Sequence, residues 1–600
     1  MYFLITESPA KARKIQTFLD STKYLVKSSC GHIVDLEKKK LSIDVDNNFK
    51  PTYKVLSDKK EIVKMLKSNA KNKTVIIASD DDREGEAIGW HCSNTLKLKL
   101  NDKNRIIFRE ISKNAILKSL KNPQKININE VNAQQTRRII DRLIGFKLSP
   151  CLWKHIQCKE YGLSAGRVQS ALLNLLWEKE NDIKNYDPDI SLSINGSFDD
   201  KIQCEFIFTN GNDDFSNDFI KDLFLKFSDS NEFLISSQKK SNEKLYPKKP
   251  FITSSLQQSA QNELGFPVKV TMDLAQKLYE AGFITYMRTD STFISNEFVE
   301  KLNKFISDSY GNNYFQLSKE KKIKGAQEAH EAIRPTNLKN DTSDLEPSQL
   351  KLYNFILKRT VTSYMKPSES IIHHLKLIND NTFDNGYFSL KEKQVTFLGY
   401  LIYNNKKIKC DVNPEFKKNY LLQTCISSEK EDNHPNFYNE SAIVKLLEDT
   451  GIGRPSTYAT IISTLDNRNY TIKKDFQPND IIDSQIILKN NKISECQKKK
   501  KLPLQKQRIF LTPLGIQVLD YLKEHFTNIL NKNFTCNVEN DLDLIAKGKL
   551  NHNDVIRKVY HSFIEIVDRQ MNMGSIKSSL TLLGEKQSKT IYIGDGKFGP

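Results

Sequence analysis

The hydrophobic pattern at the start of the chain alternates between strand-like and helix-like segments. Short apolar runs predict strands at Met1–Thr6, Thr74–Ser79 and Arg105–Arg109. Helical spacing follows at Ala10–Leu19 and from about Glu84. Strands that alternate with helices are typical of an α/β domain with a parallel sheet, which we therefore expect at the N-terminus.

The pattern changes twice in the middle of the chain. The segment from about 130 to 181 has the spacing of helices, with basic residues on one side and apolar residues on the other. Short alternating runs then predict antiparallel strands from about Ile190 and again over 371–427. The intervening 254–309 has a helical pattern, so we expect a helical block inserted into a β-rich domain.

The last long segment, 439–570, is expected to be helical. Within it, the lysine-rich QKKKKLPLQKQR (497–508) predicts a solvated loop or insertion. We find no convincing internal repeat.

Composition gives the chain a basic character. Among its 600 residues, 91 are Lys or Arg and 73 are Asp or Glu, which gives a formal net charge of +18. This excess indicates a nucleic acid or another polyanion as the partner, although a basic protein without such a partner could have the same composition. At roughly 150 residues per domain, the length suffices for about four domains.

Cysteine spacing and hydropathy exclude several classes of protein. The nine cysteines are scattered without a CxxC pair, which argues for reduced thiols and against zinc ribbons. No stretch approaches the ~18 uninterrupted apolar residues of a membrane span. The N-terminal MYFLITESPAK lacks the features of a signal peptide. We therefore expect an intracellular protein with no zinc and no membrane partner.

An acidic cluster directly follows the strand predicted at Thr74–Ser79. The run SDDDREGE contains Asp80, Asp82 and Glu84, and Glu7 ends the first predicted strand. Functional groups of doubly wound sheets gather beyond the carboxyl ends of neighbouring strands, so these carboxylates are expected to lie together. Crowded carboxylates repel one another unless a cation is present, and their hard oxygens favour Mg²⁺. The alternative is a solvated acidic start of a helix.

Two other segments carry candidate phosphate chemistry. In ITESPAK, Lys11 is expected to reach a phosphate. In GFITYMRTDST, an extended backbone would place Tyr286 and Arg288 on one face. A phenol with a pKa near ~10 is a poor nucleophile at neutral pH, and an adjacent guanidinium would stabilise the phenolate and clamp the attacked phosphate. Taken alone, such a pair is common and is more typical of a packed tyrosine beside a surface arginine.

Four segments combine small residues with Arg, Ser, Thr or Gln. They are NAQQTRRIIDR (132–142), GLSAGRVQS (162–170), AQEAHEAIRPT (326–336) and GIGRPSTYATIIS (451–463). Such segments let backbone amides and guanidinium groups approach phosphates closely, although each is also compatible with turns and helix caps. No GxxxxGK[ST] run occurs, so neither a P-loop nor an ATP requirement is predicted.

Eight motifs occur in a recognisable order along the chain. They are ITESPAKARKI, SCGHIVDL, ASDDDREGEAIGWH, NAQQTRRIIDRLIGF, LSAGRVQS, GFITYMRTDS, AQEAHEAIRPT and GIGRPSTYATIIS. Their order resembles that of type IA DNA topoisomerases, and of the bacterial topoisomerase I group in particular, from residue 1 to about residue 570. The resemblance implies a multidomain α/β plus α and β fold, with an N-terminal Toprim (Rossmann-like) domain and a toroidal core.

The same resemblance implies a function. The enzyme would be an isomerase that cleaves one DNA strand through a 5′-phosphotyrosine, passes the other strand and religates, thereby relaxing negatively supercoiled DNA. It would need Mg²⁺ but neither ATP nor zinc. We expect a monomer that acts with DNA inside the cell, on a single-stranded segment of the supercoiled duplex.

Site residues follow from the resemblance position by position. Tyr286 matches the nucleophile and Arg288 the arginine beside the scissile phosphate. Glu7 matches the carboxylate that handles the proton of the 3′-oxygen, with Lys11 as its cationic neighbour. The catalytic set also includes His330, and the Mg²⁺ set comprises Glu7, Asp80, Asp82 and Glu84. The DNA-binding set comprises His32, Arg137, Arg138, Asp141, Arg142, Phe146, Trp153, Ser164, Ala165, Gly166, Arg167, Val168, Gln169, Arg454, Ser456 and Arg468.

Changes in pattern and the resemblance together divide the chain into seven parts. We expect a Toprim metal-binding domain at 1–125, a helical DNA-binding part of the core at 126–185, and the first part of a β-rich hinge domain at 186–250. The inserted helical domain with the catalytic tyrosine follows at 251–370, the second hinge part at 371–438 and the second helical DNA-binding part at 439–570. The remaining 571–600 resembles the start of a C-terminal repeat and is expected to be truncated. The inserted domain is expected to move as a gate on the β-rich hinge.

Two departures from the family pattern affect these expectations. The zinc ribbons that frequently end family members are absent. Several members have Tyr where this chain has Phe146. Either ring can stack on a base, a contact of about 1–3 kcal/mol, so stacking is expected while an inherited base preference is not.

Three other functions are compatible with parts of the pattern. A topoisomerase III-like decatenase usually carries an HHAI-type sequence where this chain has HEAIRPT. A Toprim nuclease or primase would need no tyrosine nucleophile. A silent architectural DNA-binding protein would need neither Tyr286 and Arg288 nor Glu7 and the acidic run. Topoisomerase I chemistry accounts for all of these residues together.

Overall fold

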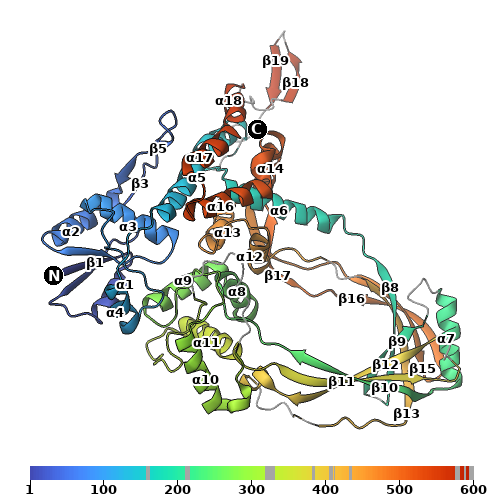
Figure 1. The fold of residues 1–600 in the computed structure, drawn as a ribbon. Helices are drawn as coiled ribbons and strands as arrows, with labels where there is room; N and C mark the ends of the chain where they lie inside the picture. The colour runs from blue at the N-terminus through green and yellow to red at the C-terminus, as the bar shows by residue number, and fades with distance from the viewer. Residues whose placement is uncertain are drawn as a thin grey trace.

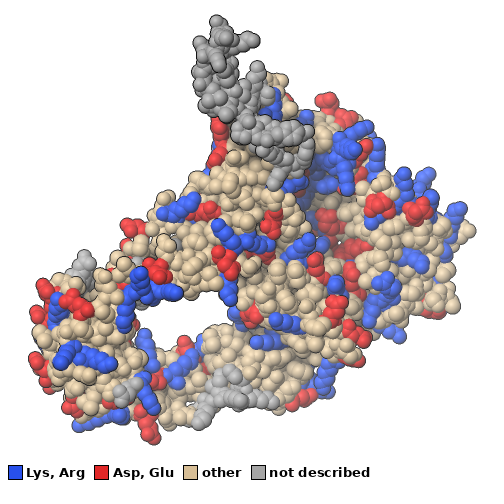
Figure 2. Space-filling view, turned by 180° about the vertical axis from the view of Figure 1, so that it is seen from behind, with Lys and Arg blue, Asp and Glu red and all other residues tan. Residues whose placement is uncertain are grey.

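The computed structural model describes residues 1–156, 158, 162–199, 201–209, 216–317, 331–381, 385–404, 410, 412–431, 435–573, 581–586 and 589–593. Its parts form a ring around an open hole, which separates the upper and lower arms of the ribbon (Figure 1) and passes through the space-filling surface (Figure 2). None of the described helices is long and apolar enough to cross a membrane.

A small parallel sheet opens the chain, as the alternating pattern predicts. Its strands β1 (Tyr2–Thr6), β2 (Tyr24–Ser28) and β7 (Thr74–Ile77) lie in the order β2-β1-β7. Side chains of β1 alternate between two cores: Phe3 packs with helices α2 (Lys60–Ala70) and α3 (Arg83–Leu96), and Leu4 packs with α1 (Pro9–Gln16) and α4 (Lys113–Lys121). Burial on both faces explains why these strands are apolar throughout.

The segment 105–109 is not the strand that its sequence predicted. Only Arg105 pairs with the sheet, through a single parallel bridge to Ile77. The Arg105 side chain is fully buried and donates to the carbonyls of Ser79 and Asp80 and to the carboxylate of Glu86. The segment therefore supports the carboxyl end of β7 through a side chain instead of a ladder of backbone hydrogen bonds. Short elements between β2 and α2 are β3 (Val34–Leu36), β4 (Ile43–Asp44), β5 (Lys50–Pro51), β6 (Tyr53–Val55) and η1 (Ser57–Lys59).

Two helices from the first third of the chain share one hydrophobic core with its C-terminal helices. They are α5 (Ile128–His155) and α6 (Arg167–Lys184). This helical core places residues far apart in sequence side by side at one end of the ring (Figure 1). The C-terminal helices are α12 (Glu440–Asp449), α13 (Tyr458–Asn467), α14 (Pro513–His525), α15 (Thr527–Leu530), α16 (Lys532–Ala546), α17 (His552–His561) and α18 (Ile564–Asn572).

A β-rich domain forms the far end of the ring. Its strands follow the order β10-β11-β12-β9-β8-β13-β15-β16, and β10 also pairs with β13, which closes the first six into a barrel. Phe198, Phe233 and Phe388 contact one another in its core, and α7 (Asn217–Asp229) packs beside it. The strands are β8 (Ile190–Phe198), β9 (Ile202–Phe208), β10 (Glu232–Leu245), β11 (Ser368–Ile378), β12 (Gly386–Phe397), β13 (Asn419–Glu431), β15 (Ile481–Lys489) and β16 (Lys492–Lys500).

The segment 439–570 is less helical than its sequence predicted. It contains β15, β16 and the antiparallel pair β14 (Thr471–Phe476) with β17 (Gln505–Leu511). The lysine-rich 497–508 is therefore mostly strand, because β16 continues to Lys500 and β17 begins at Gln505. Consecutive lysines mimic a loop in sequence, yet they suit an edge strand whose side chains reach solvent.

The inserted helical block lies between β10 and β11, as the sequence pattern predicted. It has one hydrophobic cluster in common with the N-terminal domain, in which Leu4 and Ile76 pack together with Leu278 and Tyr286. The block therefore rests directly on the parallel sheet. Its elements are α8 (Thr253–Ser259), η2 (Ala260–Leu264), α9 (Val268–Glu280), α10 (Asn296–Tyr310), η3 (Asn312–Tyr314) and α11 (Pro347–Thr362), and η4 (Gly399–Tyr403) follows β12. A last hairpin joins β18 (Thr581–Lys586) to β19 (Lys589–Ile593).

Candidate active site

Two carboxylates and one lysine meet at the carboxyl ends of β1 and β7. Ser8 caps helix α1, whose first turn directs Lys11 back toward these strand ends. The buried Lys11 ammonium contacts both Glu7 and Asp80. The resemblance implied Lys11 as the cationic neighbour of Glu7, and the structure adds Asp80 as its second partner. The expected contact of Lys11 with a phosphate stays a prediction.

Burial and this pairing shift the pKa values of the three groups. Burial, reinforced by the charge of Asp80, raises the pKa of Glu7 well above its usual value. Burial would also raise the pKa of Asp80, but the charge of Lys11 outweighs it and the pKa of Asp80 is lowered. The pKa of Lys11 is raised, because its two anionic partners outweigh its desolvation. Glu7 can therefore hold a proton at a higher pH than an ordinary glutamate can, beside a carboxylate that stays ionised.

Tyr286 and Arg288 converge on a single oxygen of Asp82. Asp82 caps helix α3 by accepting from the backbone N of Gly85 through Oδ1. Its other oxygen, Oδ2, accepts a hydrogen bond from the Tyr286 hydroxyl at 2.5 Å and lies 3.4 Å from Nη1 of Arg288. The predicted nucleophile and its predicted arginine, both from the inserted block, thus meet the acidic run of the N-terminal domain.

The surroundings of Tyr286 keep its hydroxyl protonated. Burial is the main cause that raises the pKa of Tyr286, and the charges of Asp82 and Asp80 raise it further. The charge of Arg288 acts in the opposite direction. The pKa of Arg288 is itself raised, because the attraction of these anionic neighbours outweighs the effect of its burial. Among these charged neighbours, Arg288 is therefore the group that favours the phenolate.

A second buried tyrosine, Tyr279 on α9, also belongs to the site. Its hydroxyl donates to Oδ1 of Asp80 at 3.0 Å, and its ring centroid lies 4.9 Å from the Lys11 ammonium. The ring also makes an edge contact with Tyr286 at 5.2 Å between centroids. Sequence analysis missed Tyr279 because it lies on the apolar side of a predicted helix, where core residues and site residues look the same.

Backbone contacts hold Tyr286 against the N-terminal domain. The Tyr286 backbone N donates to the carbonyl of Arg109 at 2.9 Å. Gly282 has a φ of +84°, and a Cβ there would lie 2.7 Å from the carbonyl oxygen of Ile111, so a residue without a side chain is needed at this approach. Arg334 adds an ion pair with Glu110 at 3.1 Å. The inserted block is thus closed on the N-terminal domain in this structure.

The predicted metal ligands are only partly gathered. Within the described residues, no three His, Cys, Asp or Glu side chains are arranged so that they could hold a metal ion. Lys11 lies between Glu7 and Asp80, whereas Asp82 and Glu84 border the same cavity. Two hard carboxylates fit Mg²⁺, which commonly takes one or two protein carboxylates and completes its shell with water and phosphate oxygens. Chemically the donors suit the ion, and all four predicted ligands, Glu7, Asp80, Asp82 and Glu84, border one open space in this region.

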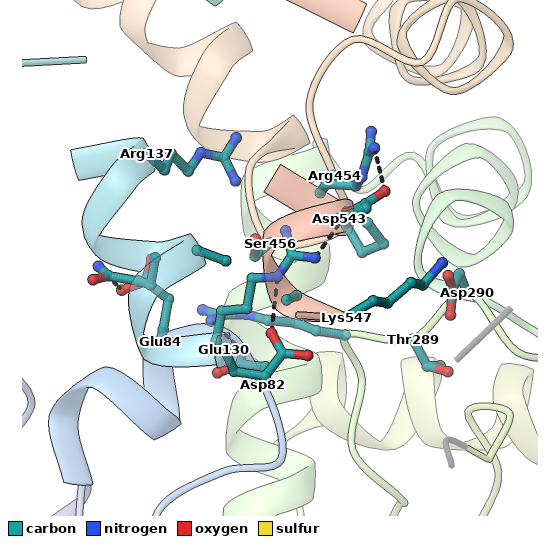
Figure 3. A pocket seen from close by; sticks show the side chains of 16 residues that line it. Asp82, Glu84, Glu130, Arg137, Thr289, Asp290, Arg454, Ser456, Asp543 and Lys547 are labelled. Atoms are coloured by element: carbon teal, nitrogen blue, oxygen red, sulfur yellow. Dashed lines mark hydrogen bonds and ion pairs between the residues drawn. The ribbon is translucent and has the colours of Figure 1, made fainter. Parts of the chain in front are cut away.

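A cavity of about 250 Å³ lies beside this cluster, between the N-terminal domain, α5, α16 and the inserted block (Figure 3). A second space of about 590 Å³ also borders Asp82, Glu84 and Arg288, so the two form neighbouring parts of one groove. Charges of both signs line the first cavity. A negatively charged ligand can bind beside the basic side chains only if the acidic side chains that now pair with them move away. Its charged lining comprises Asp82, Arg83, Glu84, Glu130, Arg137, Arg288, Asp290, Arg454, Asp543 and Lys547.

Four of the predicted DNA-binding residues lie at this groove. Arg137, Arg454 and Ser456 line the cavity, and His32 lines the neighbouring space. His32 Nε2 lies 3.1 Å from Glu84, which ties it to the acidic run.

Four other predicted DNA-binding residues lie along α5. Arg138 forms an ion pair with Asp35 at 2.6 Å, and Arg142 donates to the carbonyls of 36–38. Phe146 and Trp153 are exposed, Trp153 by 60%, which is unusual for so large an apolar ring. Their rings are accessible for stacking on bases.

The predicted loop 164–169 is held from inside the helical core. The backbone N of Ser164 bonds to the hydroxyl of Tyr470, and the Gln169 amide donates to the carbonyl of Ser164. Gly166 is the N-cap of α6, Ala165 is buried and Val168 is half-buried. Arg468 is exposed and donates to the carbonyl of Gly162, next to this loop.

Arg167 is the predicted DNA contact that the structure places differently. It is 1% exposed, and its guanidinium lies 2.8 Å from Glu539 and 3.5 Å from Asp141. In this conformation Arg167 lies beneath the groove. Of its two carboxylate partners, Glu539 is buried and Asp141 reaches the surface. His330 lies outside the described residues.

Comparisons with known proteins point in one direction. A family model described as "DNA topoisomerase" matches residues 125–482, and a model described as "Toprim domain" matches residues 3–111. The chain is 37% identical to the DNA topoisomerase 1 of Campylobacter jejuni, over 99% of this chain and 83% of that protein. It also resembles the structure of full-length topoisomerase I from Thermotoga maritima, with a TM-score of 0.81, 33% identity, and coverage of 100% of this chain and 95% of that one.

Proposed function

The chain belongs to the type IA DNA topoisomerase family, with an N-terminal Toprim domain, and on this premise we propose that Tyr286, Arg288 and Glu7 carry its strand cleavage and religation. As a DNA topoisomerase it is an isomerase whose partner is DNA. The observation that carries the residue assignment is the convergence of Tyr286 and Arg288 on Asp82 of the Toprim domain.

The proposed cleavage exchanges one phosphoester for another. The Tyr286 oxygen forms a bond to the phosphorus of a single strand, and the bond from that phosphorus to the 3′-oxygen breaks, leaving a 5′-phosphotyrosine and a 3′-hydroxyl. Arg288 neutralises charge on the phosphate and favours the phenolate. Asp82 Oδ2 accepts the phenolic hydrogen bond before attack, and the phenolic proton leaves through this carboxylate to solvent as the oxygen–phosphorus bond forms.

The leaving 3′-oxygen needs a proton, which must be recovered when the strand is rejoined. Glu7 suits this task because its raised pKa lets it hold a proton, and Lys11 fixes its carboxyl group in place. Bond energy is conserved in the phosphotyrosine, so the cycle needs no ATP.

Toprim domains generally bind Mg²⁺. We assign the ion to Asp82 and Glu84, which border both spaces of the groove, with Glu7 and Asp80 beside them at the larger space. When bound, Mg²⁺ would neutralise and position phosphates of the strand. No zinc site is part of the proposal.

Strand passage requires the inserted block to leave the Toprim domain while it carries the covalently bound 5′ end. The interface that would open contains Tyr279, Tyr286 and Arg288 on one side and Asp80 and Asp82 on the other. Passage of the other strand through this opening would relax negatively supercoiled DNA, with the protein acting as a monomer on a single-stranded segment.

Plasmid relaxation tests the proposal. The protein is incubated with negatively supercoiled plasmid and Mg²⁺ without ATP, and denatured samples are analysed for protein attached to a DNA end. We expect relaxation and protein on the 5′ end, with both lost in Tyr286→Phe. Tyr353→Phe is the matched control, because the hydrogen bonds of this buried hydroxyl among the described residues, to Asn337 and Asn340, lie within the inserted block. Cleavage by Tyr286→Phe would refute the assignment and favour a Toprim nuclease, and protein on the 3′ end would refute the 5′-phosphotyrosine.

A further inference from the structure

Helix α16 brings two carboxylates, one turn apart, to the arginines of the DNA-binding groove. Glu539 is fully buried and accepts from Arg137 at 3.0 Å and from Arg167 at 2.8 Å. Its place is beneath the groove, since Glu539 does not line the cavity. Sequence analysis missed α16 because its acidic residues look like the solvated side of an ordinary helix.

Asp543 differs from Glu539 in its exposure and in its partners. One carboxylate oxygen, Oδ1, accepts from Arg83 at 2.7 Å, and the other, Oδ2, accepts from Arg454 at 2.8 Å. Its side chain is 34% exposed and lines the cavity (Figure 3). Two oxygens of one anion, each held by a different guanidinium at an accessible position, reproduce the contacts of a phosphate between two arginines.

Both arginines are also anchored independently of Asp543. Arg83 pairs with Glu130 at 3.0 Å, and Arg454 donates to the carbonyls of Gly451 and Gly453 at 3.2 and 2.8 Å. The guanidinium groups would therefore stay in place if Asp543 withdrew. What remains would be a preformed pair of cations facing the cavity.

We propose that Asp543 is an internal competitor of DNA, whose carboxylate occupies the position between Arg83 and Arg454 that a backbone phosphate of the bound strand takes. The inference rests on the proposed function, since the ligand is a phosphate of the single strand that Tyr286 cleaves. Strand entry exchanges Asp543 for phosphate, and strand release is assisted by its return.

A further cation lies at the C-terminal end of α16, one turn after Asp543. Lys547 directly follows α16, lines the cavity and has no ion pair among the described residues. Figure 3 shows its side chain below the Arg454–Asp543 pair, with the ammonium end toward Asp290. The adjacent phosphate of the strand is its expected partner.

Competition predicts that removing the competitor tightens binding. Asp543→Asn keeps the shape of the side chain and removes its charge, so affinity for single-stranded DNA should rise about 3- to 10-fold at low salt. The dependence of log K on log salt should steepen by up to about one unit, because one more DNA phosphate contact then releases counterions without being offset by the carboxylate.

Fluorescence anisotropy with a labelled single-stranded oligothymidylate tests this, in the Tyr286→Phe background so that binding is measured without cleavage. Asp541→Asn is the matched control, since it removes the same charge from the same helix but pairs with Lys558, away from the cavity. We expect tightening in Asp543→Asn and unchanged affinity in Asp541→Asn. Unchanged or weaker binding by Asp543→Asn, or equal tightening by both, would overturn the proposal.

A second variant keeps the test informative if Asp543→Asn perturbs folding. In an Arg454→Gln background Asp543 has lost one of its two arginine partners, so adding Asp543→Asn should tighten binding of single-stranded DNA by less than twofold. Melting curves of all variants identify any misfolded protein. Tightening of the same size in both backgrounds would also refute the competition. Failure here leaves plasmid cleavage by the wild type intact, whereas failure of the proposed function abolishes cleavage whatever Asp543 does.

Discussion

Tyr279→Phe is expected to weaken the closed contact between the inserted block and the Toprim domain without unfolding either. The substitution removes only the hydroxyl that donates to Asp80 Oδ1 at 3.0 Å and leaves the ring against Lys11 and Tyr286. Asp80 keeps Lys11 as a partner, so no orphaned charge is created. The two partners of the lost hydrogen bond lie on the two sides of the gate, so its loss acts on gate opening.

The magnitude follows from the charge of the acceptor. A hydrogen bond to a charged group contributes about 1.5–3 kcal/mol, and each 1.4 kcal/mol is a factor of ten in an equilibrium constant. The equilibrium between closed and open gate should therefore shift toward the open form by roughly 10- to 100-fold. Because religation requires the closed form, the covalent complex should accumulate and relaxation should slow.

The assay measures the fraction of a single-stranded oligonucleotide trapped as covalent complex on denaturation, together with the rate of religation to an added 3′-hydroxyl strand. Tyr353→Phe again serves as the control, because it loses a buried hydroxyl whose partners lie within the inserted block. A covalent fraction and religation rate equal to those of the wild type would refute the role of Tyr279, as would the same change in Tyr353→Phe. A lowered melting temperature alone would indicate a structural role only.

Three further predictions concern charged groups of the site and the core. Arg288→Lys should lower the cleavage rate by roughly 10- to 1,000-fold, because an ammonium cannot reproduce the paired contacts of a guanidinium. The affinity for an oligonucleotide should change by less than about threefold. Single-turnover cleavage measures the first effect and fluorescence anisotropy the second. Burial would raise the pKa of Glu539, but Arg137, Arg167 and Arg454 lower this pKa to about 2 from 4.5. The ionised Glu539 carboxylate therefore contributes fully to the stability of the fold above about pH 4.5, and this contribution is lost as the pH falls toward 2. Melting midpoints should consequently depend less on pH across this window in Glu539→Gln than in the wild type, and equal slopes would contradict the assignment. Arg105→Met should destabilise the Toprim domain by about 3–5 kcal/mol, since it leaves the Glu86 carboxylate buried without its cation, and Arg105→Met combined with Glu86→Gln should recover part of that loss in thermal unfolding.

Local patterns predicted the parts of the fold that depend on a single segment. The strands ending at Thr6 and near Ile77 follow from apolar runs that are buried on both faces, and the inserted block follows from a change of hydrophobic period. Tyr286 and Arg288 could be assigned from the resemblance to a known family, because the pair taken alone is also typical of a packed tyrosine beside a surface arginine. Their meeting point at Asp82 required knowledge of how two domains pack.

The features that sequence could not provide depend on partners distant in the chain. The resemblance implied the pairing of Lys11 with Glu7, but not its second contact with Asp80, which follows a different strand. Arg167 has the composition of a DNA contact, yet Glu539, far along the chain, draws it into the core. The lysines of 498–500 form an edge strand because β15 offers a ladder of backbone groups, which no property of the lysines themselves indicates.

The connection between the inserted block and the barrel has a mechanical consequence. Both ends of the block leave from the same end of the antiparallel pair β10 and β11, where Leu245 lies opposite Ser368. Two antiparallel strands that are joined by a ladder of backbone hydrogen bonds bend together more easily than they twist. Such a mounting gives the block one soft direction of travel and returns it along the same path. We therefore expect a cut strand end carried on Tyr286 to return toward Asp82 and Glu7 along the path by which it left, because the same pair of strands guides both movements.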